Sequence, residues 1–173
     1  EIVVTNALTG LPEYYGREMM AQDDYRLIMA SSAIPVACHP VELNGVPYFD
    51  GGLTDAIPVR RALEQGCDKL VVILSKNRDY VRKPQGMRTL YRRACRSYPN
   101  IVDAIDRRHV VYNDNLKDVF SLEKEGTAFV FAASEPIHVG TYSMKEDAER
   151  NLYDLGLRDF AAWKNDLLEF LSI

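Results

Sequence analysis

Cysteine is scarce in this sequence and is not placed as in a disulfide frame or a metal site. The 173 residues include three cysteines, Cys38, Cys67 and Cys95, which are widely spaced and form no C-x-x-C pair. An odd number of isolated cysteines argues against a disulfide framework and indicates reduced thiols in an intracellular protein. No spacing of His, Cys, Asp and Glu resembles a zinc or EF-hand site, so we expect neither a metal nor a cofactor.

Long apolar runs, repeats and flexible linkers are missing as well. No stretch reaches the roughly 18 consecutive apolar residues of a membrane-spanning helix. Low-complexity tracts and Ser/Gly linkers that would mark a second domain are absent, and the length suits one domain. The chain passes from Glu1 straight into a strand-like segment, which we interpret as a cut end of a longer protein. We expect a cytoplasmic protein, which could also attach peripherally to a membrane.

Acidic residues are nearly absent from one stretch. Residues 76–96 hold eight Lys or Arg and a single acid, Asp79, although the whole chain has a net charge of −4. Such an asymmetry indicates either a solvated helix face or an anion-binding surface. Tyr80, Tyr91 and Tyr98 are interleaved with these charges. No nucleic-acid-binding module is recognisable, however, so we expect no nucleic acid partner.

The apolar segments and turn residues predict an α/β protein. Apolar runs at residues 2–5, 69–75 and 128–133 predict sheet strands. The second run is unbroken, as in strands that are buried on both faces of a parallel sheet. Asn44-Gly45, between two short apolar runs, is the strongest short-range signal for a β-hairpin.

Helical periodicity and helix-end residues complete the pattern. Helices are predicted over residues 23–33, 58–65, 87–97 and 100–122. A capping box, Ser143-Met144-Lys145-Glu146, predicts a further helix that ends near Gly156. The last predicted helix, over residues 157–171, is amphipathic, and its expected buried face consists of Phe160, Trp163, Leu167, Leu168 and Phe170.

Asp50-Gly51-Gly52 is the most informative motif in the chain. It follows the apolar run 46–49 and precedes a helix that Pro58 opens. The glycines allow a sharp turn and a close approach by another group, so the carboxylate is presented at a strand end, where open α/β sheets carry their chemistry. An Asp-Gly pair alone is also an ordinary turn signal. Asp55 is interpreted as a helix-start residue rather than a second catalytic acid.

Several features in order resemble the patatin-like phospholipases. They are the sequence RLIMASSAIP at residues 26–35, the hairpin, the D-G-G motif at Asp50, and IPV at residues 57–59. The resemblance covers residues 1–80 well and residues 81–173, a helical extension with one strand, only loosely. It implies that residues 1–173 are the C-terminal part of a patatin-like domain, with a partial three-layer α/β/α fold, a mostly parallel sheet and a helix-rich C-terminal half. Ala56 departs from the asparagine of many relatives.

The resemblance also implies an activity. Patatin-like enzymes hydrolyse acyl esters with a Ser–Asp dyad, in which the aspartate is the general base. That role falls on Asp50, with Gly51 and Gly52 leaving space for the serine. None of the eight serines stands in a G-x-S-x-G nucleophile elbow, and no glycine-rich oxyanion loop is present. We therefore expect part of a phospholipase or lysophospholipase acting on a lipid or acyl-ester substrate, inactive on its own.

Alternative interpretations stay open at this point. The chain could be a non-catalytic, patatin-derived module that binds a protein partner or an anionic membrane surface through Lys76–Arg96. A sheet without its other strands would expose an apolar edge, which predicts a homodimer through that edge. Ser31 and Ser32 are interpreted as structural. His39 adjoins Cys38, but adjacency in sequence does not make a nucleophile and its base.

Overall fold

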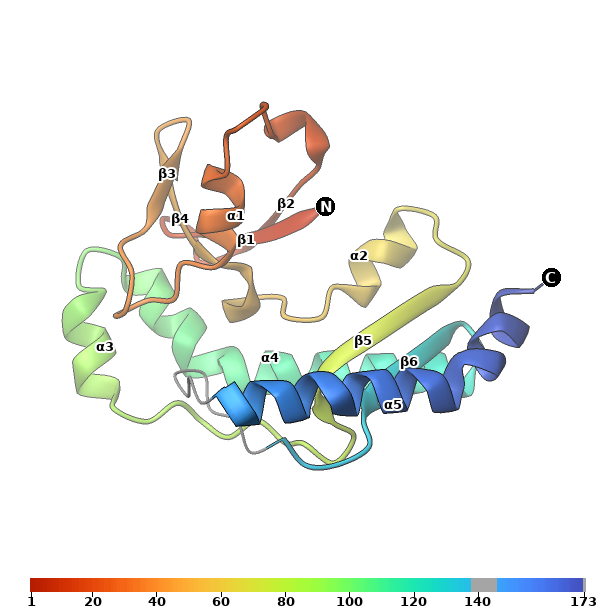
Figure 1. Cartoon of the computed structure of the whole chain (residues 1–173). Helices are drawn as coiled ribbons and strands as arrows, with labels where there is room; N and C mark the ends of the chain where they lie inside the picture. Colours follow the sequence, from red (N-terminus) through yellow and green to blue (C-terminus); the bar gives the residue numbers. More distant parts are fainter. Residues whose placement is uncertain (138–145, 173) are drawn as a thin grey trace. The chain divides into compact units, whose positions relative to one another are not determined.

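The computed structural model describes residues 1–137 and 146–172, which divide into two units. Unit 1 comprises Glu1–Pro58 and Arg82–Leu116, and unit 2 comprises Val59–Val81 and Lys117–Ile173. The long helix α4 (Pro99–Lys124) contributes residues 99–116 to unit 1 and residues 117–124 to unit 2 (Figure 1). Strands and helices occur in both units, so the chain has a mixed α/β fold.

Unit 1 is built on a four-stranded sheet in the order β2-β1-β4-β3, with every pair antiparallel. The expectation of a mostly parallel sheet is therefore wrong for this unit. Short turns connect β1 to β2 and β3 to β4, and such turns can join only antiparallel neighbours, because a parallel pair needs a crossover of about a dozen residues or more. The strands are β1 (Ile2–Asn6), β2 (Pro12–Tyr15), β3 (Val41–Leu43) and β4 (Val46–Asp50).

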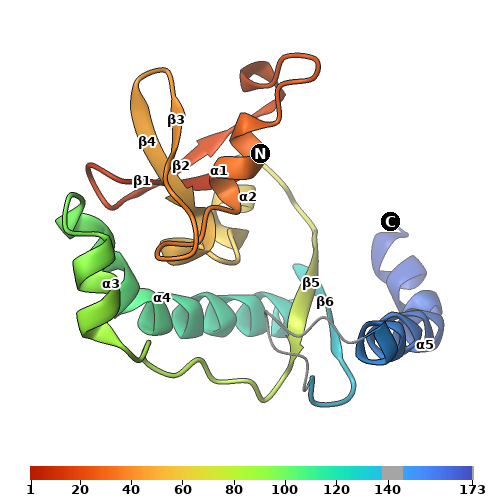
Figure 2. The same cartoon turned by 60° about the vertical axis from the view of Figure 1, so that its left-hand side comes forward.

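The β3–β4 hairpin confirms the prediction made from Asn44-Gly45 (Figure 2). Both turn residues have positive φ, 51° and 80°, which is the combination of a type I′ turn whose twist matches that of the strands. Strand β2 was not predicted, because a proline within a short run argues against a strand. Pro12 is accommodated because β2 lies at the edge of the sheet.

The sheet of unit 1 has a buried cluster on each face. Tyr48 and Phe49 are neighbours in β4 and therefore point to opposite faces. Tyr48 packs with Val4, Leu27, Ala30 and Leu43, where α1 (Arg26–Ser31) covers the sheet. Phe49 belongs to the second cluster, which includes residues of α3 (Arg88–Ala94) and α4 and consists of Ala7, Ala33, Phe49, Leu53, Tyr91, Cys95, Ile101, Val102, Ala104 and Ile105.

Unit 2 contains a two-stranded parallel sheet of β5 (Leu70–Asn77) and β6 (Ala128–Ala133). It is preceded by α2 (Val59–Glu64). Alternate residues of β5, beginning with Leu70, are buried, whereas Ile73 on the other face is 79% exposed. The unbroken apolar run predicted burial on both faces, and the described residues bury only one. The parallel pairing itself agrees with the prediction.

Ion pairs and aromatic contacts hold unit 2 together. Arg78 donates to the Glu123 carboxylate of α4 at 2.6 Å and to the Val130 carbonyl of β6 at 3.2 Å. Arg60 donates to Asp118 at 2.5 Å. On the face that carries the phenylalanines of β6, the ring of Phe131 lies 6.0 Å from that of Phe160 in α5 (Glu146–Leu171).

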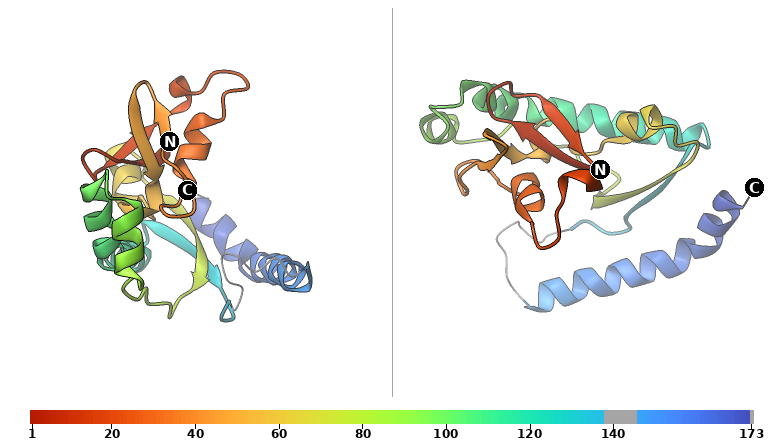
Figure 3. Two further views of the ribbon diagram at one scale, coloured as in Figure 1. Left: turned by 90° about the vertical axis from the view of Figure 1, so that its left-hand side faces the viewer. Right: turned by 90° about the horizontal axis from the view of Figure 1, so that it is seen from above.

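Helix α5 is unbroken from Glu146 to Leu171 (Figure 3). The prediction of two helices divided near Gly156 was therefore wrong. An isolated glycine costs a helix about 1 kcal/mol relative to alanine but does not end it, and no proline follows. Residues 143–145 of the predicted capping box lie outside the described residues.

The predicted buried face of α5 is largely exposed. Phe160, Trp163 and Leu168 are exposed, while Leu167 and Phe170 are half-buried. The amphipathic pattern was recognised correctly, but within the described residues its apolar side is covered only in part. No helix in the described ranges has both the length and the apolarity to cross a membrane.

Candidate functional site

Asp50 is the last residue of β4 and caps the 3-10 turn η2 (Gly51–Leu53). Its backbone N–H donates to the Ala33 carbonyl at 3.0 Å, and its carbonyl accepts from Thr5 Oγ1 at 2.8 Å. Its carboxylate Oδ1 accepts from the Gly52 N–H at 2.7 Å. The motif thus has the strand-end position that the sequence predicts, and three hydrogen bonds hold the aspartate there.

The two glycines of the motif meet different neighbours. A Cβ on Gly51 would lie 2.2 Å from the Val3 carbonyl oxygen, so the close approach here is that of β1. A Cβ on Gly52 would lie 3.1 Å from Asp50 Oδ1 and 3.5 Å from Arg108 Nη2. Gly51 therefore allows the sheet to pack against the turn, whereas Gly52 leaves space beside the carboxylate itself.

Arg108 on α4 is a functional candidate that the sequence did not reveal. Its Nε donates to the Gly52 carbonyl at 2.8 Å, and the side chain is half-buried. A guanidinium hydrogen-bonded to the turn that carries a carboxylate places positive charge beside it. Because 56 positions separate Arg108 from Gly52, no local motif could have identified this contact.

Asp55 does not start a helix, which corrects the interpretation made from the sequence. Helix α2 begins four residues later, at Val59, and the Asp55 carboxylate accepts from the Tyr14 hydroxyl of β2 at 2.7 Å. Its N–H also donates to the Gly51 carbonyl at 2.9 Å. The Oδ1 atom of Asp55 is buried and accepts no hydrogen bond from any described residue. Asp55 therefore ties the turn after the D-G-G motif to strand β2.

A second polar cluster on the sheet centres on Glu13. Its carboxylate accepts from Asn6 Nδ2 at 2.7 Å, from the Tyr15 hydroxyl at 2.5 Å and from the Tyr48 hydroxyl at 2.7 Å. Burial alone would raise the pKa of Glu13, but these hydrogen bonds stabilise the carboxylate and hold the pKa below its usual value. Burial, together with the tyrosine and carboxylate neighbours, raises the pKa of Tyr48 far above its usual value. The cluster is thus a satisfied, ionised network.

A groove of about 300 Å³ lies beside the η2 turn in unit 1. Leu53 and Thr54 bring the end of the D-G-G turn into its wall, and α4 supplies Asn100, Asp103 and Arg107. Leu11 and Val111 add apolar surface. The groove therefore offers mixed polar and apolar walls next to the turn that holds Asp50.

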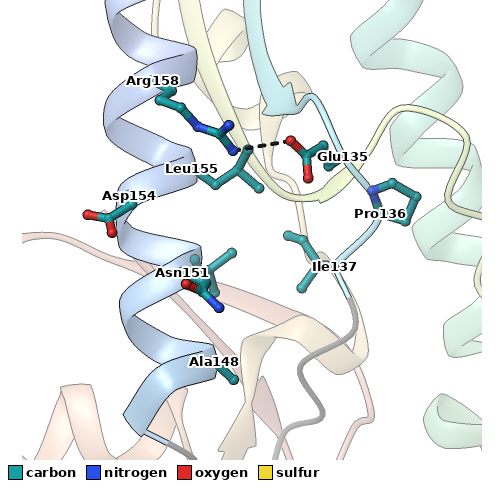
Figure 4. Close-up of a pocket in the computed structure, with 9 residues that line it drawn as sticks. Glu135, Pro136, Ile137, Ala148, Asn151, Asp154, Leu155 and Arg158 are labelled. Atoms are coloured by element: carbon teal, nitrogen blue, oxygen red, sulfur yellow. Dashed lines mark hydrogen bonds and ion pairs between the residues drawn. The ribbon is translucent and has the colours of Figure 1, made fainter.

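Unit 2 has cavities of its own. One of about 460 Å³ is lined mainly by apolar side chains of β5, β6 and α5, among them Ile73, Phe131 and Phe160. A second groove, of about 620 Å³, lies between residues 135–137 and α5, where Arg158 donates to Glu135 at 3.1 Å (Figure 4). The walls of both cavities consist of unit 2 residues.

The remaining candidates from the sequence have ordinary surroundings. Ser31 is the last residue of α1 and Ser32 caps it, in keeping with a structural role. All three cysteines are free, with Cys38 and Cys67 exposed and Cys95 buried. In residues 1–137 and 146–172 no group of three or more His, Cys, Asp or Glu side chains is placed to hold a metal ion.

Comparison with known proteins relates two segments of the chain to families. Residues 13–63, which include β4 and Asp50, match the family model of Patatin-like phospholipase. Residues 98–172 match the Domain of unknown function (DUF6363). The first match supports a lipid hydrolase family for the segment that carries the D-G-G motif.

One curated relative matches three quarters of the chain. The Uncharacterized protein YjjU of Escherichia coli (strain K12) is 31% identical over 132 residues, which are 75% of this chain and 37% of that protein. The chain therefore spans well under half the length of the curated relative that it matches.

Proposed function

We propose that Asp50 is the general base of a Ser–Asp dyad in a patatin-like acyl ester hydrolase. The observation that carries the proposal is the D-G-G turn, which lies inside the segment that matches Patatin-like phospholipase and presents Asp50 at the end of β4. Oδ1 is held by the Gly52 N–H. Among the described residues, no hydrogen bond engages Oδ2, so this atom is available to accept a proton.

The proposed chemistry follows from the two carboxylate oxygens. Oδ2 accepts the proton of a serine hydroxyl as the serine Oγ attacks the acyl carbonyl carbon. When the ester C–O bond breaks, Asp50 returns that proton to the departing alcohol and leaves an acyl-serine. The same carboxylate then deprotonates the water molecule that attacks the acyl-serine, and it returns that proton to the serine Oγ as the acyl–Oγ bond breaks and the fatty acid leaves. The hydrogen bond from Gly52 keeps the carboxylate oriented throughout.

The nucleophile in this proposal comes from outside the 173 residues. None of the eight serines has glycine at two positions before and two positions after it, so none lies in a nucleophile elbow. The chain supplies the base, and a protein that contains it together with an elbow hydrolyses phospholipids, lysophospholipids or related fatty acyl esters. The chain alone is inactive.

Hydrolysis of a p-nitrophenyl ester by the longer protein, expressed with the reading frame upstream of Glu1, tests the proposal. Asp50→Asn should lower kcat by about 100-fold or more, as loss of a general base does, without changing the circular dichroism spectrum. The matched control, Asp55→Asn, makes the same change five positions away and should retain kcat within a few-fold.

Three results would contradict the proposal. A folded Asp50→Asn protein with wild-type kcat would exclude Asp50 as the base. Ester hydrolysis by the 173-residue chain alone would show that the nucleophile lies within the chain. A longer protein without any esterase activity would favour the non-catalytic alternative.

A further inference from the structure

The basic segment at residues 76–96 separates into partnered and unpartnered side chains. Arg78 pairs with Glu123 and Arg88 with Asp106, each at 2.6 Å. Lys76 and Arg82 lie over the rings of Tyr80 and Tyr112. The remaining four side chains are exposed and have no ion pair, hydrogen bond or ring contact with any described residue: Lys83, Arg92, Arg93 and Arg96.

The three unpartnered arginines lie in α3 and in the turn directly after it, in unit 1. Helix α3 buries Tyr91, whose hydroxyl donates to Asp106. The N–H of buried Cys95 donates to the Tyr91 carbonyl at 2.8 Å, which extends the helical pattern into the following turn. Arg92 and Arg93 lie in α3 and Arg96 lies in the turn after Cys95, so the three exposed side chains fall within five consecutive residues.

No acid neutralises this surface. Residues 80–102 contain neither Asp nor Glu. On α4, Asp106 is already engaged by Arg88 and Tyr91, and Asp103 is exposed without a hydrogen bond to any of the three arginines. Like charges that lie close together on a surface repel one another. A bound anionic surface would remove that repulsion.

The same short segment also carries two exposed apolar side chains. Met87, immediately before α3, is 72% exposed, and Leu90 within α3 is 46% exposed. A nucleic acid backbone has no apolar layer that could receive these two side chains. Binding of single strands also uses exposed aromatic rings that stack on the bases, but Tyr91 is buried and Tyr98 is half-buried. A lipid bilayer offers both phosphates and an acyl boundary.

We infer that α3 and the turn after it, with Met87, form a docking surface for an anionic lipid bilayer. Arg92, Arg93 and Arg96 contact the headgroup phosphates, while Met87 and Leu90 enter the acyl boundary. This inference goes beyond the hydrolase reaction, because it concerns attachment and requires no nucleophile. Of the eight basic residues in the segment, it assigns lipid contact to three.

Vesicle sedimentation of the 173-residue chain tests the surface, with vesicles of phosphatidylcholine alone or mixed with phosphatidylserine. The triple change Arg92→Gln, Arg93→Gln and Arg96→Gln should weaken binding to the anionic vesicles about 100-fold, since each basic residue near such a surface contributes roughly fivefold. The control triple Arg17→Gln, Lys124→Gln and Lys164→Gln removes the same charge at scattered exposed positions and should bind like the wild type.

Separate variants test the apolar side chains of the docking surface. Leu90→Ser and Met87→Asn should weaken binding to anionic vesicles; asparagine suits position 87 because the residue has φ 61° and asparagine tolerates that conformation. The same variants should bind duplex and single-stranded DNA no differently from the wild type. Thermal unfolding of each variant establishes that it is folded.

Three outcomes would overturn the inference. The first is that the wild type does not bind phosphatidylserine vesicles. The second is that the α3 triple variant and the control triple variant lose binding equally, which would assign vesicle binding to net charge. Tighter binding to DNA than to vesicles, lost in the α3 triple, would assign the surface to nucleic acid. A negative result leaves the hydrolase proposal standing, because its assay uses a small ester and no membrane.

Discussion

At the residue scale, Gly51 and Gly52 separate the packing role of the D-G-G turn from its chemical role. The contact that excludes a side chain at Gly51 is with backbone, the Val3 carbonyl of β1, and backbone within a sheet cannot move aside. The contact at Gly52 is with the side chains of Asp50 and Arg108, which can rotate. The same substitution should therefore have different consequences at adjacent positions.

Gly51→Ala should destabilise unit 1 by about 3 kcal/mol, the upper end of the usual cost of overpacking. Gly52→Ala should cost less than about 1 kcal/mol, because flexible side chains absorb the 3.1 Å contact. Urea unfolding of the two variants measures the difference. Equal losses of stability would show that the turn, rather than its contact with β1, limits both positions.

Glu13 should make the stability of the protein depend on pH. Hydrogen bonds in the folded state hold the pKa of Glu13 below its usual value. Its contribution to stability is therefore present above the unfolded pKa, near 4.3, and is lost as pH falls through the lower folded pKa. Glu13→Gln removes this carboxylate, so the loss of stability between pH 7 and pH 3 should be smaller than in the wild type.

The comparison is made from urea midpoints at several pH values. Other carboxylates with lowered pKa values, such as Asp106 beside Arg88, remain in both proteins and cancel in the difference. An identical pH dependence in the variant and the wild type would mean that the Glu13 network persists equally in the unfolded chain or does not form.

At the scale of elements, two exposed glycines with open space around them should respond in opposite ways. Gly156 lies within α5, where alanine is the better helix former, so Gly156→Ala should stabilise by about 0.5–1 kcal/mol. Gly66 follows α2 with φ 85°, a conformation that costs alanine about 1 kcal/mol or more. Thermal unfolding distinguishes them, and a gain at both positions would contradict the backbone argument.

Elements set by local chemistry were predictable, and those set by distant partners were not. Asn44-Gly45 specifies its hairpin turn through two positive φ angles, whatever lies around it. Strand β2 depends on pairing with β1, which offsets the poor strand propensity of Pro12. Gly156 suggested a helix end because glycine has a low helix propensity. The residues on either side of it continue the helix. The apolar run of β5 revealed a strand but not how many of its faces are covered.

At the scale of the whole molecule, the shared helix α4 should couple the unfolding of the two units. Ile101, in the part of α4 that belongs to unit 1, and Val119, in the part that belongs to unit 2, are both fully buried. Loss of either end would remove hydrogen bonds that continue through the same helix. We therefore expect one cooperative transition.

Thiol labelling combined with amide exchange checks this expectation. Cys38 and Cys67 are exposed and should react with Ellman's reagent at once, whereas Cys95 is buried, which shields it and raises the pKa of its thiol. Cys95 should become reactive at the urea concentration at which the amides of β5 and β6 lose protection. Reaction of Cys95 at a clearly different concentration would show that the units unfold independently.

The candidate site was predictable only as far as it is contiguous in sequence. Asp50 and its glycines form a motif, and their turn geometry follows from residue type. Arg108 reaches the Gly52 carbonyl from α4, and Tyr14 reaches Asp55 from β2. Both contacts depend on how distant segments pack, which one sequence does not specify. The basic segment lies between these cases. Its charge can be read from the sequence, but which of its side chains are paired and which are free depends on the fold.

The contact between Gly51 and Val3 also affects how a genetic screen would be interpreted. Under the proposed function, a library of random variants of the longer protein scored by ester hydrolysis should lose activity at both position 50 and position 51. Variants at Asp50 would lose activity because the proposed base is missing, and variants at Gly51 would lose activity because a destabilised protein accumulates to a lower level. A map of lost function would therefore make the catalytic site look larger than it is, and protein abundance, measured in parallel, would correct it.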